Sequence, residues 1–320
     1  MDIHLLVDNL TNPALLFFFL GLLAVRLKSD LEIPGNSSKF ISLYLLLCIG
    51  FKGGQELAHS TLDYEILSSL IMGILLALLV PVMSFFLLRF KFNVHDSGAI
   101  ASSYGSVSAV TFITAISFLE LGHITYGGHM VAVMALMEAP SIIVGVLLIK
   151  LFDKDDLEKV NMSDLLRHSF TNGSVLLILG SLCIGFLASE QQAQGIEPFT
   201  TDLFQGFLAV FLLDMGISSG KKIASFFKEG GFALAFAILM PLFNGLASAY
   251  FSGFVTELAG NRFLLAILAA SASYIAVPAA MRIAAPKANP GLYLPMALGI
   301  TFPFNITLGM PAYLFMIQMC

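Results

Sequence analysis

Ala101-Ser-Ser-Tyr-Gly-Ser-Val-Ser-Ala-Val-Thr111 interrupts a segment that is long enough to cross a lipid bilayer. Four serines, a threonine, a tyrosine and a glycine stand where an unbroken transmembrane helix would carry apolar residues. A second stretch, Ser271-Ala-Ser-Tyr-Ile-Ala-Val-Pro-Ala-Ala280, repeats the pattern 170 positions later. This shift pairs Ser103 with Ser273 and Tyr104 with Tyr274. Two matched interruptions predict two broken helices that the rest of the chain holds together.

The composition indicates a polytopic membrane protein. Hydrophobic residues make up 58% of the 320 positions, 12% are charged, and the mean hydropathy is +0.89. A soluble domain is about half apolar and about a quarter charged. We expect an all-α protein with ten transmembrane helices, each near the length that a bilayer requires. The predicted spans are 12–27, 40–59, 65–89, 97–119, 128–152, 173–189, 200–220, 231–255, 262–285 and 291–318.

The long polar connection 153–172 separates two halves of five spans each, residues 1–152 and 173–320. Further motifs repeat between the halves: a proline at 81 and 241, glycines at 49–54 and 215–220, and a proline at 140 and 303. Because five is an odd number, the second half enters the membrane upside down. Inverted repeats with interrupted helices in matching positions are typical of secondary transporters.

The basic residues predict the orientation. Fourteen of the sixteen lysines and arginines fall in the odd-numbered connections, Arg262 falls on the other side, and Lys52 lies within a span. The positive-inside rule therefore puts both termini outside a cell membrane, the inner membrane where there are two.

The two interruptions predict a binding site for a small anion. A broken helix exposes backbone groups that protein, water or ligand must satisfy. Where spans 4 and 9 cross, two half-helix N-termini would offer free N–H groups and partial positive charge. Close packing of small residues is the structural alternative for any single serine. The hydroxyls available are those of Ser102, Ser103, Ser106, Ser108, Ser271 and Ser273.

Three ionisable residues, Lys52, Glu138 and Asp214, lie inside predicted spans. A charge at the bilayer centre costs about 2.5–3.5 kcal/mol on insertion scales, so each is a functional candidate. Lys52 and Glu138 lie at similar depth by helix rise, and we expect them to pair. The alternative is a purely structural ion pair, or a contact of Asp214 with Lys221. The sequence contains no motif of a metalloprotease, a GxSxG hydrolase or a nucleotide-binding loop, and we predict no enzyme.

The chain resembles the SbtA-type sodium-dependent bicarbonate transporters over nearly its whole length. The resemblance is carried by Gly105-Ser-Val-Ser-Ala-Val-Thr111, Met137-Glu-Ala-Pro140, Leu268-Ala-Ala-Ser-Ala-Ser273 and Ala285-Pro-Lys-Ala-Asn-Pro290. It implies a 5+5 inverted repeat like that of bile-acid sodium symporters, with a core domain that slides against a gate domain. It also implies a homotrimer, and for some members inhibition by a PII-like cytoplasmic protein, although the central connection is short for that here.

The resemblance, together with the residue patterns described above, assigns the residues that bind the ligands. Bicarbonate and sodium would bind where the broken helices cross, with no further cofactor or metal and no nucleic acid. Ion coupling is assigned to Thr111, Glu138 and Lys52. Substrate binding is assigned to Ser102, Ser103, Tyr104, Gly105, Ser106, Ser108, Ser271, Ser273, Tyr274 and Ala276.

Two positions depart from the family pattern. Tyr274 stands where we expect an aspartate, and Lys52 stands where we expect a small polar residue. Losing a carboxylate and gaining an ammonium disfavour bound sodium and favour an anion or a coupled proton. Our first choice is sodium-dependent bicarbonate uptake by alternating access. The alternatives are an organic-anion symporter of the bile-acid type, a cation/proton exchanger, a non-transporting membrane sensor and an intramembrane hydrolase.

Overall fold

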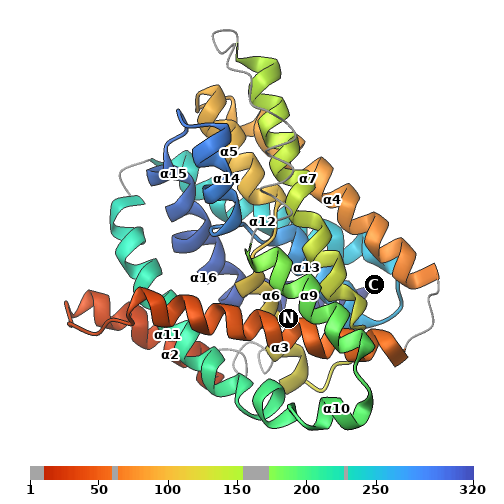
Figure 1. Ribbon diagram of the computed structural model, residues 1–320. Helices are drawn as coiled ribbons and strands as arrows, with labels where there is room; N and C mark the ends of the chain where they lie inside the picture. The colour runs from red at the N-terminus through yellow and green to blue at the C-terminus, as the bar shows by residue number, and fades with distance from the viewer. Residues whose placement is uncertain (1–10, 60–63, 154–172, 227–229) are drawn as a thin grey trace.

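The computed structural model describes residues 11–59, 64–153, 173–226 and 230–320, and the secondary structure of these residues is entirely helical (Figure 1). Seven helical segments in this part of the chain are long enough and apolar enough to cross a membrane. Three shorter apolar helices accompany them, Pro13–Arg26, Leu176–Leu187 and Ala259–Ala270. The predicted all-α polytopic architecture is confirmed. The seven segments are Gly35–His59, Tyr64–Leu88, Val94–Leu121, His129–Phe152, Pro198–Lys222, Gly231–Phe254 and Pro290–Met319.

Four helices form one set, which we call the four-helix set. In it, α2 (Pro13–Arg26) packs along α11 (Phe204–Phe226), and α3 (Gly35–His59) packs along α9 (Gly173–Leu187). Glycines allow the backbones to approach closely, as in many membrane helix pairs. A Cβ atom on Gly216 of α11 would overlap the carbonyl oxygen of Phe18 in α2. A Cβ atom on Gly54 of α3 would likewise overlap the carbonyl oxygen of Leu182 in α9.

The helices of the other six predicted spans, the third to fifth and the eighth to tenth, form a second group, which we call the six-span set. Helices α4 (Tyr64–Leu88), α5 (Val94–Gly105) and α7 (His129–Phe152) pack on one another. So do α12 (Gly231–Phe251), α13 (Ala259–Ala270) and α17 (Met310–Met319). Helix α13 joins the two triplets by contacting α4, α7 and α6 (Ala109–Leu121). The stacked rings of Phe118 and Phe263, 5.4 Å apart, lie at the contact between α6 and α13.

Capping side chains mark the start of several of these helices. The Asn12 side chain accepts a hydrogen bond from the N–H of Ala14 at 2.9 Å, and Pro13 occupies the first turn of α2. Asn93 caps α5 by accepting from the N–H of Asp96 at 2.8 Å. Such side chains satisfy N–H groups that have no partner within the helix. The shorter elements are α10 (Glu190–Gln194), η1 (Pro198–Asp202), η2 (Ser252–Phe254) and α14 (Ala276–Ala284).

The last span is divided into turns of different pitch. It runs through α15 (Pro290–Leu294), η3 (Pro295–Thr301), α16 (Phe302–Phe304) and η4 (Asn305–Gly309) before α17. Both η3 and η4 are π-helical. π-Helical turns are rare and are frequently found at functional sites. This span packs beside the second broken helix, so its irregular turns lie next to the candidate site.

Candidate functional site

The first interruption lies where the serine-rich stretch predicts it. Helix α5 ends at Gly105 and α6 begins at Ala109. Between them the backbone is extended, with ψ at 172° for Ser106 and 107° for Ser108. The Ser108 hydroxyl then caps α6 by accepting from the N–H of Thr111 at 3.2 Å. The small polar residues therefore end one half-helix and start the next.

The second interruption has the same construction. Helix α13 ends at Ala270, Ser271 is extended with ψ at 165°, and α14 begins at Ala276. The hydroxyl of Ser273 accepts a hydrogen bond from the N–H of Val277 at 3.4 Å. Pro278 lies in the first turn of α14, where its missing N–H leaves no helical hydrogen bond unmade.

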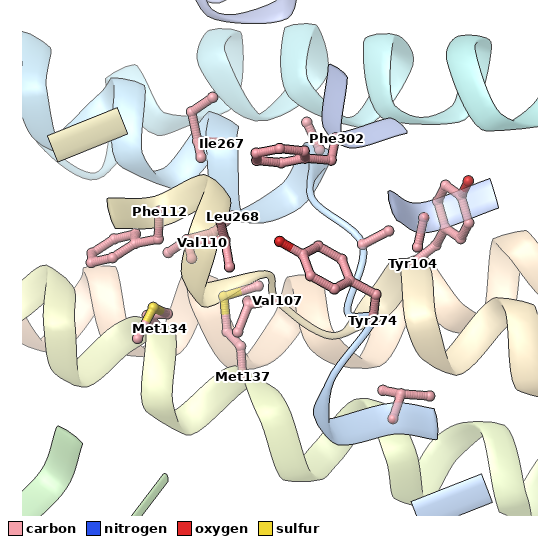
Figure 2. Packing of buried hydrophobic residues seen from close by; sticks show 14 of the residues in the cluster. Tyr104, Val107, Val110, Phe112, Met134, Met137, Ile267, Leu268, Tyr274 and Phe302 are labelled. Atoms are coloured by element: carbon pink, nitrogen blue, oxygen red, sulfur yellow. The ribbon is translucent and has the colours of Figure 1, made fainter. Parts of the chain in front are cut away.

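The two interruptions are in direct contact, and Figure 2 shows the crossing with Val107 on one side and Tyr274 on the other. The N–H of Ser273 donates to the carbonyl oxygen of Ser103 at 2.8 Å. The N–H of Ser108 donates to the hydroxyl of Ser271 at 3.1 Å. These two hydrogen bonds replace some of the backbone hydrogen bonds that both segments lack because they are not helical.

A small cavity of about 30 Å³, which we call the serine cavity, opens beside this crossing. The first residues of both downstream half-helices, Ala109 and Ala276, line it. Because helix N-termini carry partial positive charge, the cavity lies between two favourable positions for an anion. Its volume is near that of one or two waters. The other lining residues are Ser42, Leu46, Val107, Ser108, Met134, Glu138, Ser273, Tyr274 and Ile275.

Glu138 brings the one carboxylate to the lining of this cavity. It lies in α7, two residues before Pro140. Within the described part of the chain, no side chain or backbone group forms a hydrogen bond or an ion pair with this carboxylate. An unpaired carboxylate in a membrane-spanning helix is suited to bind a cation or a proton.

The assigned substrate residues divide into two groups. Ser108, Ser273, Tyr274 and Ala276 line the cavity. Ser102, Ser103, Tyr104, Gly105, Ser106 and Ser271 are buried behind it, and so is Thr111. Among the described residues, the hydroxyls of Ser102, Ser103 and Ser106 have no hydrogen-bond partner. A bound water or ion is one explanation of buried polar atoms without partners.

Tyr104 and Gly105 pack inside the six-span set. The Tyr104 hydroxyl shares a hydrogen bond of 2.7 Å with that of Thr301 in the last span. Its ring meets Phe236 of α12 edge-on at 5.0 Å. A Cβ atom on Gly105 would overlap the ring of Pro81, so only glycine fits beside that proline. These contacts hold α5 in place, and neither residue lines the cavity.

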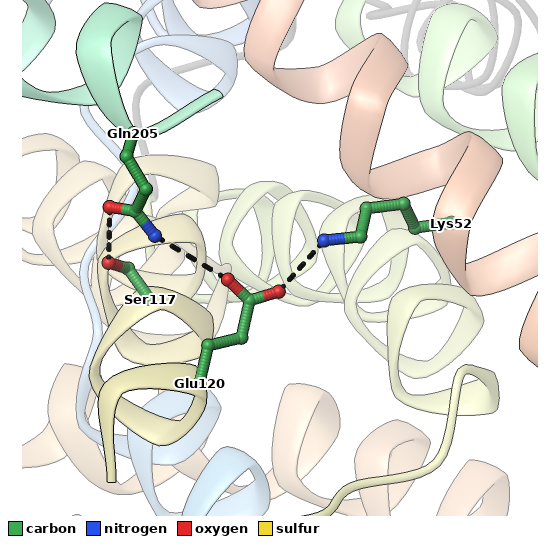
Figure 3. A network of polar contacts seen from close by, with 4 residues as sticks. All are labelled: Lys52, Ser117, Glu120 and Gln205. Carbon is green, nitrogen blue, oxygen red and sulfur yellow. Dashed lines mark hydrogen bonds and ion pairs between the residues drawn. The ribbon is translucent and has the colours of Figure 1, made fainter. Parts of the chain in front are cut away.

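The partner of Lys52 differs from the one that depth alone predicts. The expected Lys52–Glu138 pair is wrong, because the Lys52 ammonium pairs with Glu120 at 2.9 Å (Figure 3). Glu120 also accepts from the Gln205 amide at 3.5 Å, and Gln205 accepts from Ser117 at 3.1 Å. This network joins α3, α6 and α11. Lys52 lines a different, open cavity of about 290 Å³ together with Glu190 and Glu197.

Asp214 has a hydrogen-bond partner on another helix. Its carboxylate accepts a hydrogen bond from the Ser38 hydroxyl at the start of α3. It therefore ties α11 to α3 within the four-helix set and lies outside the serine cavity. Asp214 therefore has a structural partner in Ser38, and the positive charge of Lys221 also acts on it.

Several residues around the site carry no sequence signal by themselves. Ser141 of α7 donates from its hydroxyl to the carbonyl oxygen of Ser102 at 3.0 Å. The Asn305 amide donates to the carbonyl oxygen of Ala270 at 2.8 Å. Both side chains come from the span that follows a broken helix, and both hold the end of its first half. A polar residue beside the proline of each following span, at 140–141 and 303–305, is the signal that could have pointed to them.

Comparison with known proteins identifies the family of the chain. The family model described as the Na+-dependent bicarbonate transporter superfamily matches residues 13–318. The match covers both broken helices and nearly the whole chain. No individual curated protein matches the chain.

Proposed function

The chain belongs to the Na+-dependent bicarbonate transporter superfamily, a family of membrane transporters and not of enzymes, and we propose that it takes up bicarbonate with sodium by alternating access. The observation that carries this proposal is the convergence of three groups on one cavity. The N-terminal ends of α6 and α14 line it, and so does the unpaired carboxylate of Glu138. The first two suit an anion and the third suits a cation.

A 5+5 inverted repeat of ten spans is supported by the pattern of helix contacts. Helix α3 packs on α9, and α11 packs on α2, as spans 2 and 6 and spans 7 and 1 of an inverted repeat would. The matched glycines Gly50 and Gly216 serve corresponding contacts. A Cβ atom on Gly50 would meet the Ile178 carbonyl of α9, and one on Gly216 would meet α2. We therefore assign residues 1–152 and 173–320 as the two halves, with a connection whose residues 154–172 lie outside the described part.

The division into two helix sets supports alternating access. We assign the four-helix set as the gate domain and the six-span set as the core domain. Ser42 and Leu46 of α3 face the cavity from the gate side, whereas Ser108, Ser273 and Glu138 face it from the core side. A slide of the core along α3 would carry a ligand held by the crossing from one membrane face to the other.

The coupling ion depends on Glu138 and Tyr274. Lys52 no longer argues against sodium, because its charge is compensated by Glu120 and it lines a separate cavity. Tyr274 does line the serine cavity, and its hydroxyl contacts the Met215 sulfur at 3.7 Å. A tyrosine supplies a neutral oxygen where a carboxylate would supply charge. Glu138 is therefore our principal cation ligand, with Thr111 and the serine oxygens as neutral partners, and a coupled proton is the second candidate.

The size of the cavity favours a small anion. A cavity of about 30 Å³ is near the volume of one or two waters, so it would have to widen much further for a bile-acid-like substrate than for a small inorganic anion. The proposed assembly is a homotrimer in the inner or cell membrane with both termini outside. Control by a PII-like protein would involve the central connection, most of which lies outside the described residues.

Uptake into proteoliposomes tests the function. We would measure labelled bicarbonate entry with an inward sodium gradient, with choline in its place, and with a proton gradient alone. The proposal expects uptake that requires sodium. Uptake driven by the proton gradient without sodium would overturn sodium coupling, and no uptake under any gradient would overturn bicarbonate as the substrate.

Glu138→Gln tests the assigned cation ligand. We expect it to abolish the sodium dependence while the protein remains folded, because glutamine keeps the shape and removes the charge. Glu257→Gln, at an exposed position, is the matched control and should transport normally. A Glu138→Gln protein with unchanged sodium dependence would exclude this carboxylate from coupling.

A further inference from the structure

An apolar groove of about 420 Å³ lies between α4 and α12, apart from the serine cavity. Its floor is formed by the buried side chains of Phe236 and Met240. Its walls are Met83 and Leu87 from α4 and Leu239 and Phe243 from α12, which are between 42% and 60% exposed. Both helices belong to candidate membrane spans. The groove therefore opens toward the hydrocarbon of the bilayer, where acyl chains are the available apolar filling.

Positive charge is concentrated at one end of this groove. Helix α4 ends at Leu88 and α12 begins at Gly231, so the connection after α4 lies at the groove end near Leu87. The ring of Phe92 in that connection contacts the ring of Phe232, a groove residue, at 5.8 Å. The guanidinium of Arg89 donates to the carbonyl oxygen of Phe92 at 2.9 Å. This places the Arg89 charge beside the end of the groove.

Two exposed cations are available there for a phosphate. Arg89 uses one N–H of its guanidinium on Phe92 and keeps further donors for an acceptor. Lys91 is exposed two residues further along the same connection. The positive-inside pattern assigns this end of the helices to the cytoplasmic leaflet, which carries the anionic lipids.

We propose that this groove binds an anionic phospholipid, with one acyl chain between α4 and α12 and the phosphate held by Arg89 and Lys91. The apolar lining binds the acyl chain, and the two cations at the groove end favour a charged headgroup over a neutral one. A second copy of this protein would bury the apolar walls equally well, but it would not require two basic residues at the groove end. The charge therefore favours the lipid.

Native mass spectrometry of the full-length protein tests this proposal. The protein is released from detergent containing equal amounts of phosphatidylglycerol and phosphatidylcholine, and the retained lipids are counted. We expect phosphatidylglycerol to be retained preferentially. In the double variant Arg89→Gln/Lys91→Gln the preference should fall by about five-fold per charge, about 25-fold in total. Lys28→Gln/Lys39→Gln, which removes two exposed charges far along the chain from the groove, should keep it.

A second variant tests the groove itself. Ala235→Phe places a ring in the exposed groove lining and should reduce the total number of retained lipids by one per protein. An unchanged preference in the double variant, or an unchanged lipid count in Ala235→Phe, would overturn the proposal. Loss of the oligomer in Ala235→Phe with the lipid count unchanged would assign the groove to a second copy instead. Because the double variant alters exposed residues only, it remains informative if Ala235→Phe fails to fold.

Discussion

The N–H of Ser273 donates a hydrogen bond to the carbonyl oxygen of Ser103, 2.8 Å away. These two serines are the residues that a shift of 170 positions pairs between the halves of the sequence. In an inverted repeat, a residue can touch its own counterpart only where the axis relating the halves passes. In the proposed inverted repeat, this contact would place the axis at the crossing of the two breaks, beside the cavity that Ser108 and Ser273 line.

Ser106→Ala should lower transport without lowering stability. Its hydroxyl is fully buried and has no partner among the described residues, so its removal breaks no bond within the fold. If the hydroxyl contacts an ion during transport, its loss should reduce the uptake rate by roughly ten-fold or more, since hydrogen bonds to charged groups contribute about 1.5–3 kcal/mol. Initial uptake rates and thermal unfolding of the same preparation check both expectations.

Ser141→Ala is the matched comparison for Ser106→Ala. The Ser141 hydroxyl donates to the Ser102 carbonyl oxygen at 3.0 Å, so this variant loses a bond within the fold. We expect it to be less stable by about 1 kcal/mol. If Ser106→Ala were destabilised as much as Ser141→Ala, the Ser106 hydroxyl would have a structural role.

Gly216→Ala should separate α2 from α11. The added Cβ would overlap the carbonyl oxygen of Phe18, which cannot move without the helix. Overpacking of this kind costs about 1–3 kcal/mol, which thermal unfolding in detergent should report. Gly206→Ala in the same helix is the control, because a Cβ there meets no described atom within 4 Å. Replacing that glycine should be neutral or stabilising by up to about 1 kcal/mol.

The proposed inverted repeat extends this expectation to Gly50→Ala. Its Cβ would lie 2.7 Å from the carbonyl oxygen of Ile178 in α9. A comparable loss of stability is expected because Gly50 is the sequence counterpart of Gly216. A stable Gly50→Ala protein beside an unstable Gly216→Ala protein would contradict equivalent packing in the two halves.

The breaks could be predicted from sequence because they are local. Clusters of serine within apolar spans are visible without knowing any contact. The structure has α5 ending at Gly105, inside the first quoted stretch, and α13 ending at Ala270, one residue before the second. The partner of Lys52 could not be predicted in this way. Helix rise gives the depth of a residue but not the direction in which its side chain points, so Glu138 matched Lys52 in height and faces a different cavity.

Glu120 and Asn305 were missed for a related reason. Glu120 follows the predicted end of span 4 at residue 119, where a carboxylate is expected to be solvated, but α6 continues to Leu121. Asn305 gives one polar side chain to an apolar span, and its role depends on π-helical turns that a regular helical period does not predict. Both residues act through contacts with segments distant in sequence, and sequence periodicity contains no information about those contacts.

Tyr274→Asp should strengthen sodium coupling. Tyr274 lines the serine cavity where the family pattern has an aspartate, so the variant would restore a carboxylate beside Glu138. We expect the sodium concentration for half-maximal uptake to fall by about ten-fold, equivalent to about 1.4 kcal/mol. Tyr274→Phe is the control, because it removes the hydroxyl, with its contacts to Ser108 and to the Met215 sulfur, without adding a charge. Equal behaviour of both variants would mean that sodium does not bind near this position.

Cross-linking residues 52 and 120 should stop transport. Lys52 belongs to α3 of the proposed gate, Glu120 belongs to α6 of the proposed core, and their side chains meet at 2.9 Å. If the core slides along the gate, this pair must separate in every cycle. In a background in which Cys48, Cys183 and Cys320 are replaced by alanine, a short bifunctional thiosulfonate should join Lys52→Cys to Glu120→Cys. Bicarbonate uptake should then fall to background and recover after reduction.

The pair of positions 65 and 261 supplies the control for this experiment. The Asn261 amide donates to the Glu65 carboxylate at 2.7 Å, and both residues belong to the six-span set. Glu65→Cys and Asn261→Cys joined by the same reagent should continue to transport, since these residues move together. If the link between 65 and 261 also stopped uptake, or the link between 52 and 120 left it intact, the boundary between core and gate would have to be drawn through different helices.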